Sequence, residues 1–243
     1  MTPSMRVLLI DDERLARAEL RRLLAAHPHV EIVGEAANAA EGVQQIAALQ
    51  PDLVLLDVQM PGGSGFDMLA ALDHAPQVIF TTAFDRYALQ AFEVNALDYL
   101  QKPIQPARMA AALQRCAARQ PAIAAPGAGA TPVTTPPKLF IKDGERCWFV
   151  ALDDIRLFES DGNYTRTYFD THRPLMLRSL SQLEERLDPQ RFFRASRRHI
   201  VNLGFIERVT ANESGGLDLT LRDGMAIEVS RRRAAQFRSL TNF

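Results

Sequence analysis

Short apolar runs alternate with helix-like segments through the first half of this chain. The runs cover residues 6–10, 30–36, 52–57, 77–83 and 96–103, and a helical pattern follows each one. Runs that are almost continuously apolar are typical of strands buried on both faces, as in a parallel sheet covered by helices. In such a sheet, reactive residues collect at the carboxyl ends of the strands.

Acidic residues stand at two of these strand ends. Asp11 and Asp12 follow the first apolar run, and Asp57 closes the third. If the first and third strands are neighbours, the three carboxylates meet at one edge and raise one another's pKa unless a cation neutralises them. A hard divalent ion with oxygen ligands, such as Mg²⁺, fits this requirement.

A hydroxyl and an ammonium group stand at two other strand ends. Thr82 lies where the fourth run ends, and Lys102 lies where the fifth run ends. Acids, a hydroxyl and a lysine around a metal are typical of phosphoryl transfer. In this interpretation Asp57 is the nucleophile, while Thr82 and Lys102 hold the phosphoryl oxygens.

Residues 5–118 resemble the receiver domain of two-component response regulators. The resemblance rests on the segments "LLIDDE", "LVLLDVQMPGGSG", "VIFTTA" and "DYLQKP". It implies a flavodoxin-like α/β fold with a five-stranded, doubly wound parallel sheet, and it implies that Asp57 is the phosphoacceptor. It also implies that Mg²⁺ is bound by Asp12, Asp57 and the backbone carbonyl of Gln59, with Asp11 acting mostly through water.

The same resemblance implies a conformational switch. Thr82 corresponds to the switch hydroxyl and Tyr99 to the switch aromatic residue, and the Lys102–Pro103 bond is expected to be cis. Since a phosphoryl group adds about two negative charges, Thr82 would move toward it and Tyr99 would turn into the vacated space. The face formed by residues 84–103 is then expected to pair with a second copy in a two-fold dimer.

The composition changes after residue 118. Residues 119–137, "RQPAIAAPGAGATPVTTPP", are rich in Ala, Pro, Gly and Thr, which predicts an extended, mobile linker. Downstream, short strand-like segments with Asp-Gly and Gly-Gly turns predict a mostly β domain with one internal helix over 179–187. The predicted organisation is therefore a first domain at 1–118, a linker at 119–137 and a second domain at 138–243.

Residues 138–243 resemble the LytTR DNA-binding domain. The resemblance rests on "LDDIRLFESDGNYTRTYF", "LRSLSQLEERLDPQRFFRASRRHIVNLGFIERV" and "GMAIEVSRRRAAQFRSL". It implies that DNA is contacted from loops rather than from a paired recognition helix. The expected contacts come from a turn, from the segment 191–203 and from the end of the last strand: Asn163, Tyr164, Arg194, Arg197, Arg198, Arg231 and Arg232.

These residues are expected to divide into two kinds of contact. Base edges are assigned to Asn163, Arg197 and Arg231, and phosphates to Arg194, Arg198 and Arg232. An alternative for three arginines, Arg191, Arg194 and Arg233, is that they pair with local acids such as Glu184, Glu185 and Asp188. The family usually has His-Arg-Ser where this chain has Ser196-Arg197-Arg198, so the base preference of relatives does not transfer directly.

Charge, cysteine and hydropathy patterns narrow the class of protein. The net charge of −1 combines an acidic first half with a basic second half whose clustered arginines suit a polyanionic partner. Cys116 and Cys147 resemble neither a disulfide framework nor a zinc site, so we expect both to be packing residues. The sequence contains no apolar run of about 18 residues and no signal-peptide pattern, which predicts a cytoplasmic protein with no membrane partner.

Together these patterns predict a phosphorylation-dependent transcription regulator. A sensor histidine kinase would phosphorylate Asp57, and the homodimer would bind promoter repeats in double-stranded DNA, with no enzymatic activity beyond its own phosphotransfer and autodephosphorylation. One alternative is a haloacid-dehalogenase-like phosphatase, which would carry an aspartate where Gln59 stands. Another is an interaction adaptor whose β domain binds protein or RNA. Salt-dependent binding to duplex DNA distinguishes these hypotheses.

Overall fold

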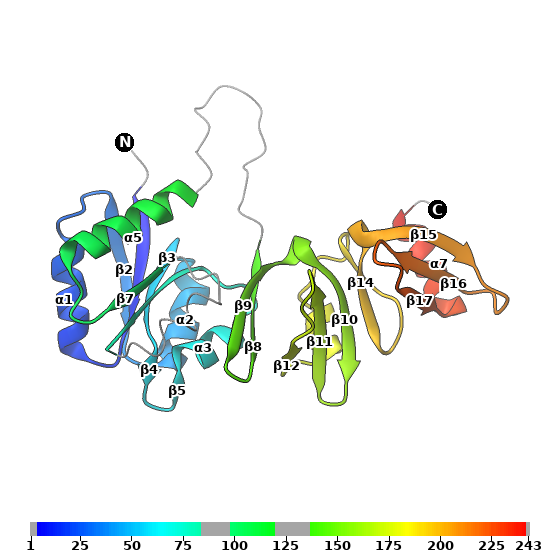
Figure 1. Ribbon diagram of the computed structural model, residues 1–243, viewed down its shortest axis with the longest axis horizontal. Helices are drawn as coiled ribbons and strands as arrows, with labels where there is room; N and C mark the ends of the chain where they lie inside the picture. Colours follow the sequence, from blue (N-terminus) through cyan, green and yellow to red (C-terminus); the bar gives the residue numbers. More distant parts are fainter. Residues whose placement is uncertain (1–3, 84–97, 120–136, 242–243) are drawn as a thin grey trace, which may run out of the picture. The chain divides into compact units, whose positions relative to one another are not determined.

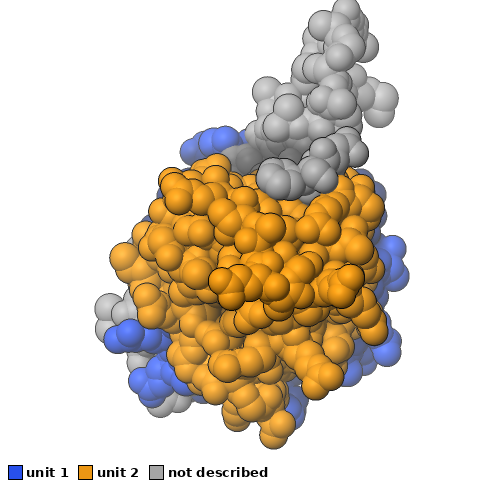
Figure 2. All heavy atoms as spheres, turned by 90° about the vertical axis from the view of Figure 1, so that its right-hand side faces the viewer, with its two compact units in different colours: residues 1–149 blue, residues 150–243 orange. Residues whose placement is uncertain are grey.

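The computed structural model describes residues 4–83, 98–119 and 137–241 (Figure 1). Contacts divide the chain into two compact units, Met1–Phe149 and Val150–Phe243 (Figure 2). Nearly all of the predicted linker, and residues 84–97 of the predicted dimer face, lie outside the described residues. No helix in the described ranges is both long and apolar enough to cross a bilayer.

The first unit contains the predicted five-stranded parallel sheet. Its strands are β1 (Met5–Ile10), β2 (Val30–Ala36), β3 (Leu53–Asp57), β6 (Gln77–Thr82) and β7 (Asp98–Gln101). The spatial order is β2-β1-β3-β6-β7, and every neighbouring pair is parallel. The order confirms the doubly wound fold and places the first and third strands side by side.

Helices cover both faces of this sheet. One face packs against α1 (Arg14–Leu24) and α5 (Pro106–Arg119), and the other against α2 (Ala39–Leu49) and α3 (Gly65–Ala71). The Asn38 side chain accepts a hydrogen bond from Glu41 N at the start of α2, and Ser64 and Asp67 form a capping box at the start of α3. A short ladder of β4 (Gln59–Met60) and β5 (Gly63–Ser64) connects β3 to α3.

A β-hairpin beyond the predicted linker packs on the first unit. It consists of β8 (Lys138–Asp143) and β9 (Arg146–Ala151), and β8 lies beside α3 (Figure 1). Buried Phe140 joins the core cluster that contains Phe66, and Ala75 N donates a 2.9 Å hydrogen bond to Lys138 O. The compact first unit therefore extends through residue 149, well past α5.

The second unit is built mainly from antiparallel strands, as predicted. One sheet has the order β12-β11-β10-β14-β13, and its strands are β10 (Ile155–Asp161), β11 (Tyr164–Phe169), β12 (Leu175–Met176), β13 (Phe192–Arg194) and β14 (His199–Asn202). A second sheet has β15 (Ile206–Ala211), β16 (Leu217–Leu221) and β17 (Ala226–Val229) in sequence order. Short 3₁₀ turns, Leu152–Asp154 and Leu203–Phe205, precede β10 and β15.

Two α-helices complete the second unit. The predicted internal helix is present as α6 (Leu180–Glu184), and α7 (Arg231–Thr241) is the last helix in the described residues. The prediction that Arg231 and Arg232 stand at the end of the last strand is wrong, because β17 ends at Val229 and both arginines lie in the first turn of α7. The reason is the spacing of Ala234 and Phe237, which are buried on one face of that helix against the sheets.

Candidate functional sites

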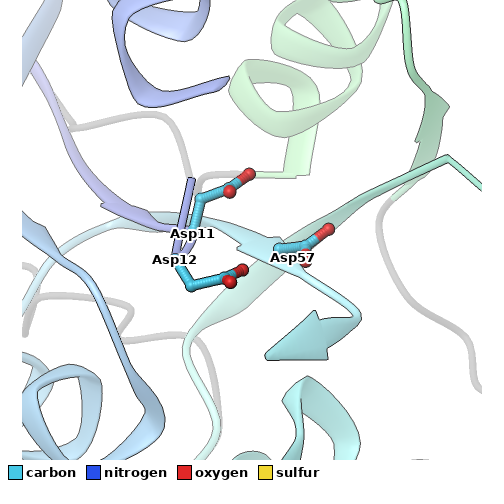
Figure 3. Close-up of side chains that lie close together, drawn as sticks. All are labelled: Asp11, Asp12 and Asp57. Atoms are coloured by element: carbon cyan, nitrogen blue, oxygen red, sulfur yellow. The ribbon is translucent and has the colours of Figure 1, made fainter. Parts of the chain in front are cut away.

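Three aspartates meet at the carboxyl edge of the parallel sheet. Asp11 follows β1 and Asp57 ends β3, and the pairing of these two strands brings both next to Asp12 (Figure 3). A carboxylate oxygen of each residue lies within 4.8 Å of one from the others. Asp11 and Asp57 are buried, so their charges are poorly screened by water. The predicted acidic cluster is therefore present.

Lys102 joins this cluster from the end of β7. Its Nζ lies 2.7 Å from Asp11 Oδ2 and 3.2 Å from Asp57 Oδ1. The pKa of Asp57 is raised from 3.8 to about 6, mainly because its carboxyl group is buried; Lys102 acts to lower this pKa, and the charges of Asp11 and Asp12 act to raise it. Burial lowers the pKa of Lys102, but its hydrogen bond to Asp11 and the charge of Asp57 raise it above its usual value. One ammonium thus faces more negative charge than it can neutralise.

Backbone contacts hold these side chains in place. Arg17 Nη1 donates a 2.6 Å hydrogen bond to Asp11 O, and Glu13 N donates to Asp11 Oδ1 at 3.0 Å. Gly65, the first residue of α3, leaves room for the strand end, since a Cβ there would lie 2.4 Å from Asp57 O. Lys102 N donates a 2.8 Å hydrogen bond to Thr82 O, which ties the ends of β6 and β7 together. These contacts attach the side chains of the cluster to the ends of the strands.

The other predicted residues of this site lie around the cluster. Thr82 is buried at the end of β6, two positions from Phe80, and Phe80 pairs with Tyr99 across the β6–β7 ladder. Tyr99 is partly buried against the core, and Gln59 is exposed in β4. The Lys102–Pro103 bond is cis, as expected. The switch roles of Thr82 and Tyr99 stay predictions.

This donor set suits a hard divalent cation. Carboxylate oxygens are the ligands that Mg²⁺ prefers, and at least one carboxylate of this cluster is costly to ionise without a further positive charge. Asp11, Asp12 and Asp57 therefore fit the ion that their sequence positions predict. A phosphoryl acceptor at Asp57 would have Lys102 within reach of the oxygens that it receives.

Two of the segments predicted to contact DNA lie at one end of the larger sheet of the second unit. The turn 161–164 connects β10 to β11, and the turn 195–199 connects β13 to β14. Glu159 pairs with His199 across the β10–β14 ladder, and Ser160 N donates a 2.8 Å hydrogen bond to Arg198 O. The two turns are therefore neighbours, although 30 or so residues separate them in sequence.

Most of the predicted DNA-contacting residues are exposed. Those with exposed side chains are Asn163, Tyr164, Arg197, Arg198, Arg231 and Arg232. Arg194 differs, because its side chain is only 11% exposed and lies near Glu184. The alternative that these arginines pair with local acids therefore holds for Arg194 and Arg233, which both lie near Glu184. It also holds for Arg191, although its partner is Asp153 and not Asp188.

The sequence interpretation missed a polar network beneath the turn 195–199. Tyr168 Oη donates a 2.6 Å hydrogen bond to Glu159, and Arg198 Nη2 lies 3.0 Å from the same carboxylate. The hydrogen bond from Tyr168, together with His199 and Arg198, lowers the pKa of Glu159 despite its partial burial. The sequence feature that could have indicated this network is the two-residue turn at Gly162 and Asn163. That turn sets the register of β10, which carries Glu159, against β11, which carries Tyr168.

Two families match this chain in consecutive segments. Residues 7–114 match the family described as the response regulator receiver domain, and residues 145–242 match the LytTr DNA-binding domain. The two segments together span nearly all of the described residues of both units.

Relatives are similar over almost the whole length. A response regulatory protein of Vibrio cholerae is 35% identical over 240 residues, covering 97% of this chain and 98% of its own. The transcriptional regulatory protein BtsR of Salmonella typhimurium is 36% identical over 234 residues, covering 94% of this chain and 95% of its own. The sensory transduction protein LytT of Enterococcus faecalis is 32% identical over 237 residues, covering 96% and 98%.

Proposed function

The chain belongs to the response regulators that join a receiver domain to a LytTR DNA-binding domain, and we propose that phosphorylation of Asp57 controls its binding to DNA. The observation that carries the proposal is the position of Asp57, at the end of β3, between two further carboxylates and Lys102. We propose a receiver domain at 1–118, a linker at 119–137 and a DNA-binding domain at 138–243, of which residues 138–149 pack in the first compact unit.

The proposed chemistry is transfer of a phosphoryl group from a sensor histidine kinase. A carboxylate oxygen of Asp57 attacks phosphorus, the bond from phosphorus to the kinase histidine breaks, and an aspartyl phosphate forms on this chain. Lys102 stabilises the negative charge of the transferred oxygens. Asp11, Asp12, Asp57 and the carbonyl of Gln59 would hold Mg²⁺, which supplies charge neutralisation to the phosphoryl oxygens when bound. Phosphotransfer and autodephosphorylation would be the only reactions of the chain.

The proposed output is a change in the β6–β7 region that promotes pairing of two copies. Thr82 ends β6, and Tyr99 lies in the neighbouring strand, so a hydroxyl drawn toward a phosphorylated Asp57 would alter the space beside Tyr99. Pairing of two copies would bring two DNA-binding domains to repeated promoter sites, which raises affinity without new contacts. We place this protein in the cytoplasm, where its kinase and its promoters would both reach it.

The proposed DNA surface combines the two neighbouring turns with the first turn of α7. Asn163, Arg197 and Arg231 would contact base edges, while Tyr164, Arg198 and Arg232 would lie along the backbone. Glu184 lies 3.5 Å from both Arg194 and Arg233, which supports placing the start of α7 near the turn 195–199. Two of these three segments carry exposed arginines, Arg197 with Arg198 and Arg231 with Arg232, and such a surface suits a polyanion better than a protein groove.

Two measurements on the full chain test the proposal. Wild-type protein treated with acetyl phosphate and Mg²⁺ should gain one hydroxylamine-labile phosphoryl group by mass spectrometry, and Asp57→Ala should gain none. Binding of wild-type protein to duplex DNA should weaken steeply with salt, because phosphate contacts release counterions. Mapping the genomic sites bound by wild-type and by Asp57→Ala protein would then show which promoters depend on phosphorylation. A flat salt response together with an unmodified Asp57 would overturn the proposal.

A further inference from the structure

Arg194 lies at the base of the turn that carries Arg197. It is the last residue of β13, and the turn is closed by hydrogen bonds from Ala195 N and Ser196 N to His199 O, at 3.0 and 3.3 Å. From this position the Arg194 guanidinium reaches back over the turn. Its Nε donates to Ser196 O at 2.7 Å, and its Nη2 donates to Arg197 O at 2.9 Å.

These two bonds fix consecutive peptide groups of the turn. The carbonyls of Ser196 and Arg197 flank the Cα of Arg197, so holding both oxygens fixes the direction in which the Arg197 side chain leaves the backbone. A guanidinium supplies two donors in one rigid plane, whereas the ammonium of lysine is a single flexible point charge. The contact therefore depends on the shape of Arg194 as well as on its charge.

Arg197 is the residue that this arrangement presents to solvent. Its side chain is exposed and forms no ion pair with any residue in the described ranges, while Arg198 beside it pairs with Glu159. The Arg194 side chain, by contrast, is only 11% exposed, and its Nη1 lies 3.5 Å from Glu184 Oε2. Its donors face the protein, and its charge already has an acidic partner.

We propose that Arg194 is a positioning residue for DNA recognition and that it sets the orientation from which Arg197 meets a base edge. This replaces the phosphate contact expected for Arg194 from its place in the sequence, and it rests on the proposed binding of DNA by this unit. Loss of the two bonds would leave Arg197 charged and exposed but free to rotate, so discrimination between sequences would fall while attraction to phosphates would remain.

Substitution of Arg194 by lysine separates positioning from phosphate contact. The full chain is titrated with a duplex selected by wild-type protein from a randomised library, and with the same duplex after its base order is scrambled, over a range of salt concentrations. We expect Arg194→Lys and Arg194→Gln both to lower the ratio of the two affinities by about tenfold to a hundredfold, the range for one bidentate base contact. We expect the salt slope on the scrambled duplex to stay at the wild-type value. Arg208→Lys, at an exposed position of β15, is the matched control and should change neither quantity.

A phosphate contact would give the opposite pattern. Arg194→Gln would weaken binding to both duplexes by a similar factor and lower the salt slope by about one, while Arg194→Lys would keep both near wild type. That outcome would overturn the inference. Circular dichroism melting of each variant shows whether the second unit still folds, and a folded Arg194→Lys protein that retains the full affinity ratio also overturns it. If wild-type protein binds no duplex at all, the proposed function fails instead.

Discussion

The ring of Phe140 stacks on that of Phe66, with centroids 6.5 Å apart and planes 12° apart. Phe140 belongs to the hairpin β8–β9 and Phe66 to the first turn of α3, seventy-odd residues earlier, so the contact ties a segment beyond the linker to the first unit. Phe66 also packs on Phe80 in β6, at 4.6 Å between centroids. The hairpin thus belongs to the same core as the strand that ends at Thr82.

Replacing Phe140 should destabilise the first unit. Phe140 is almost fully buried, and Phe→Ala at such sites costs about 3–5 kcal/mol through lost burial and a residual cavity. Urea denaturation of Phe140→Ala should therefore show a lower midpoint for the transition of this unit. Arg146→Ala, at an exposed position of the same hairpin, is the control and should stay within about 0.5 kcal/mol of wild type.

A truncation tests the same contact without a point substitution. A fragment of residues 1–151 should be more stable than one of residues 1–119, because the shorter fragment exposes the face of α3 that Phe140, Cys147 and Phe149 cover. Equal urea midpoints for the two fragments, or a Phe140→Ala protein as stable as wild type, would show that the hairpin does not belong to this core.

The acidic cluster should make metal-free protein less stable as the pH rises. Asp57 has a folded pKa of about 6 against 3.8, so the folded state binds the proton more tightly than the unfolded state. The contribution of Asp57 to the free energy of unfolding is therefore greatest below about pH 4 and is lost as the pH rises through about 6. The loss is on the order of 2–3 kcal/mol by pH 7.

Asp57→Asn provides the comparison, since it removes the titrating group and keeps its shape. In buffers free of divalent cations, the variant should be more stable than wild type at pH 7, and the difference should shrink toward pH 4. Urea midpoints at a series of pH values measure it. A difference that does not vary with pH would mean that the charge of Asp57 is not costly in the folded state.

Mg²⁺ should raise the stability of the first unit through the same cluster. A ligand that binds only the folded state stabilises it by about 1.4 kcal/mol for each tenfold excess over its Kd. Melting temperature should therefore rise with Mg²⁺ for wild type, and the rise should be largely lost in Asp12→Asn. Glu31→Gln, an exposed acid of β2 away from the cluster, should respond like wild type. A rise of equal size in Asp12→Asn would place the ion elsewhere.

The sequence was sufficient to predict the sheet and its acidic edge. Residues 30–36 were predicted as a strand and β2 covers Val30–Ala36, while Asp57 was predicted to end the third strand and does. The prediction for β3 succeeded because a strand buried on both faces needs a continuous apolar run, and Asp57 is the first charged residue after that run begins at Leu53. The positions of Asp11 and Asp57 then follow from strand order alone.

Other features depended on partners that the sequence does not indicate. The segment 138–149 has a strand pattern, but nothing in it points to α3 as the surface that it covers. The arginines at 231–233 gave no periodic signal, and only the burial of Ala234 and Phe237 distinguishes a helix there from a strand end. Arginine is a residue type expected at a DNA contact, so the sequence alone predicts that role for Arg194. Its guanidinium instead donates to Ser196 O and Arg197 O, because the turn folds back toward β13.

Glu159 should limit how strongly the second unit binds DNA of any sequence. Its carboxylate holds Arg198 at 3.0 Å and lies 3.6 Å from His199 Nε2, so one arginine of the turn is occupied within the protein. In Glu159→Gln the ion pair that competes with the phosphate contact proposed for Arg198 is lost. We expect affinity for the scrambled duplex to rise and its salt slope to steepen by about one. The preference for the selected duplex should fall accordingly.

Glu213→Gln is the control, because it removes an equal charge from an exposed site in the β15–β16 connection and should leave the salt slope unchanged. Identical salt slopes in the two variants would show that Arg198 already contacts DNA while paired with Glu159.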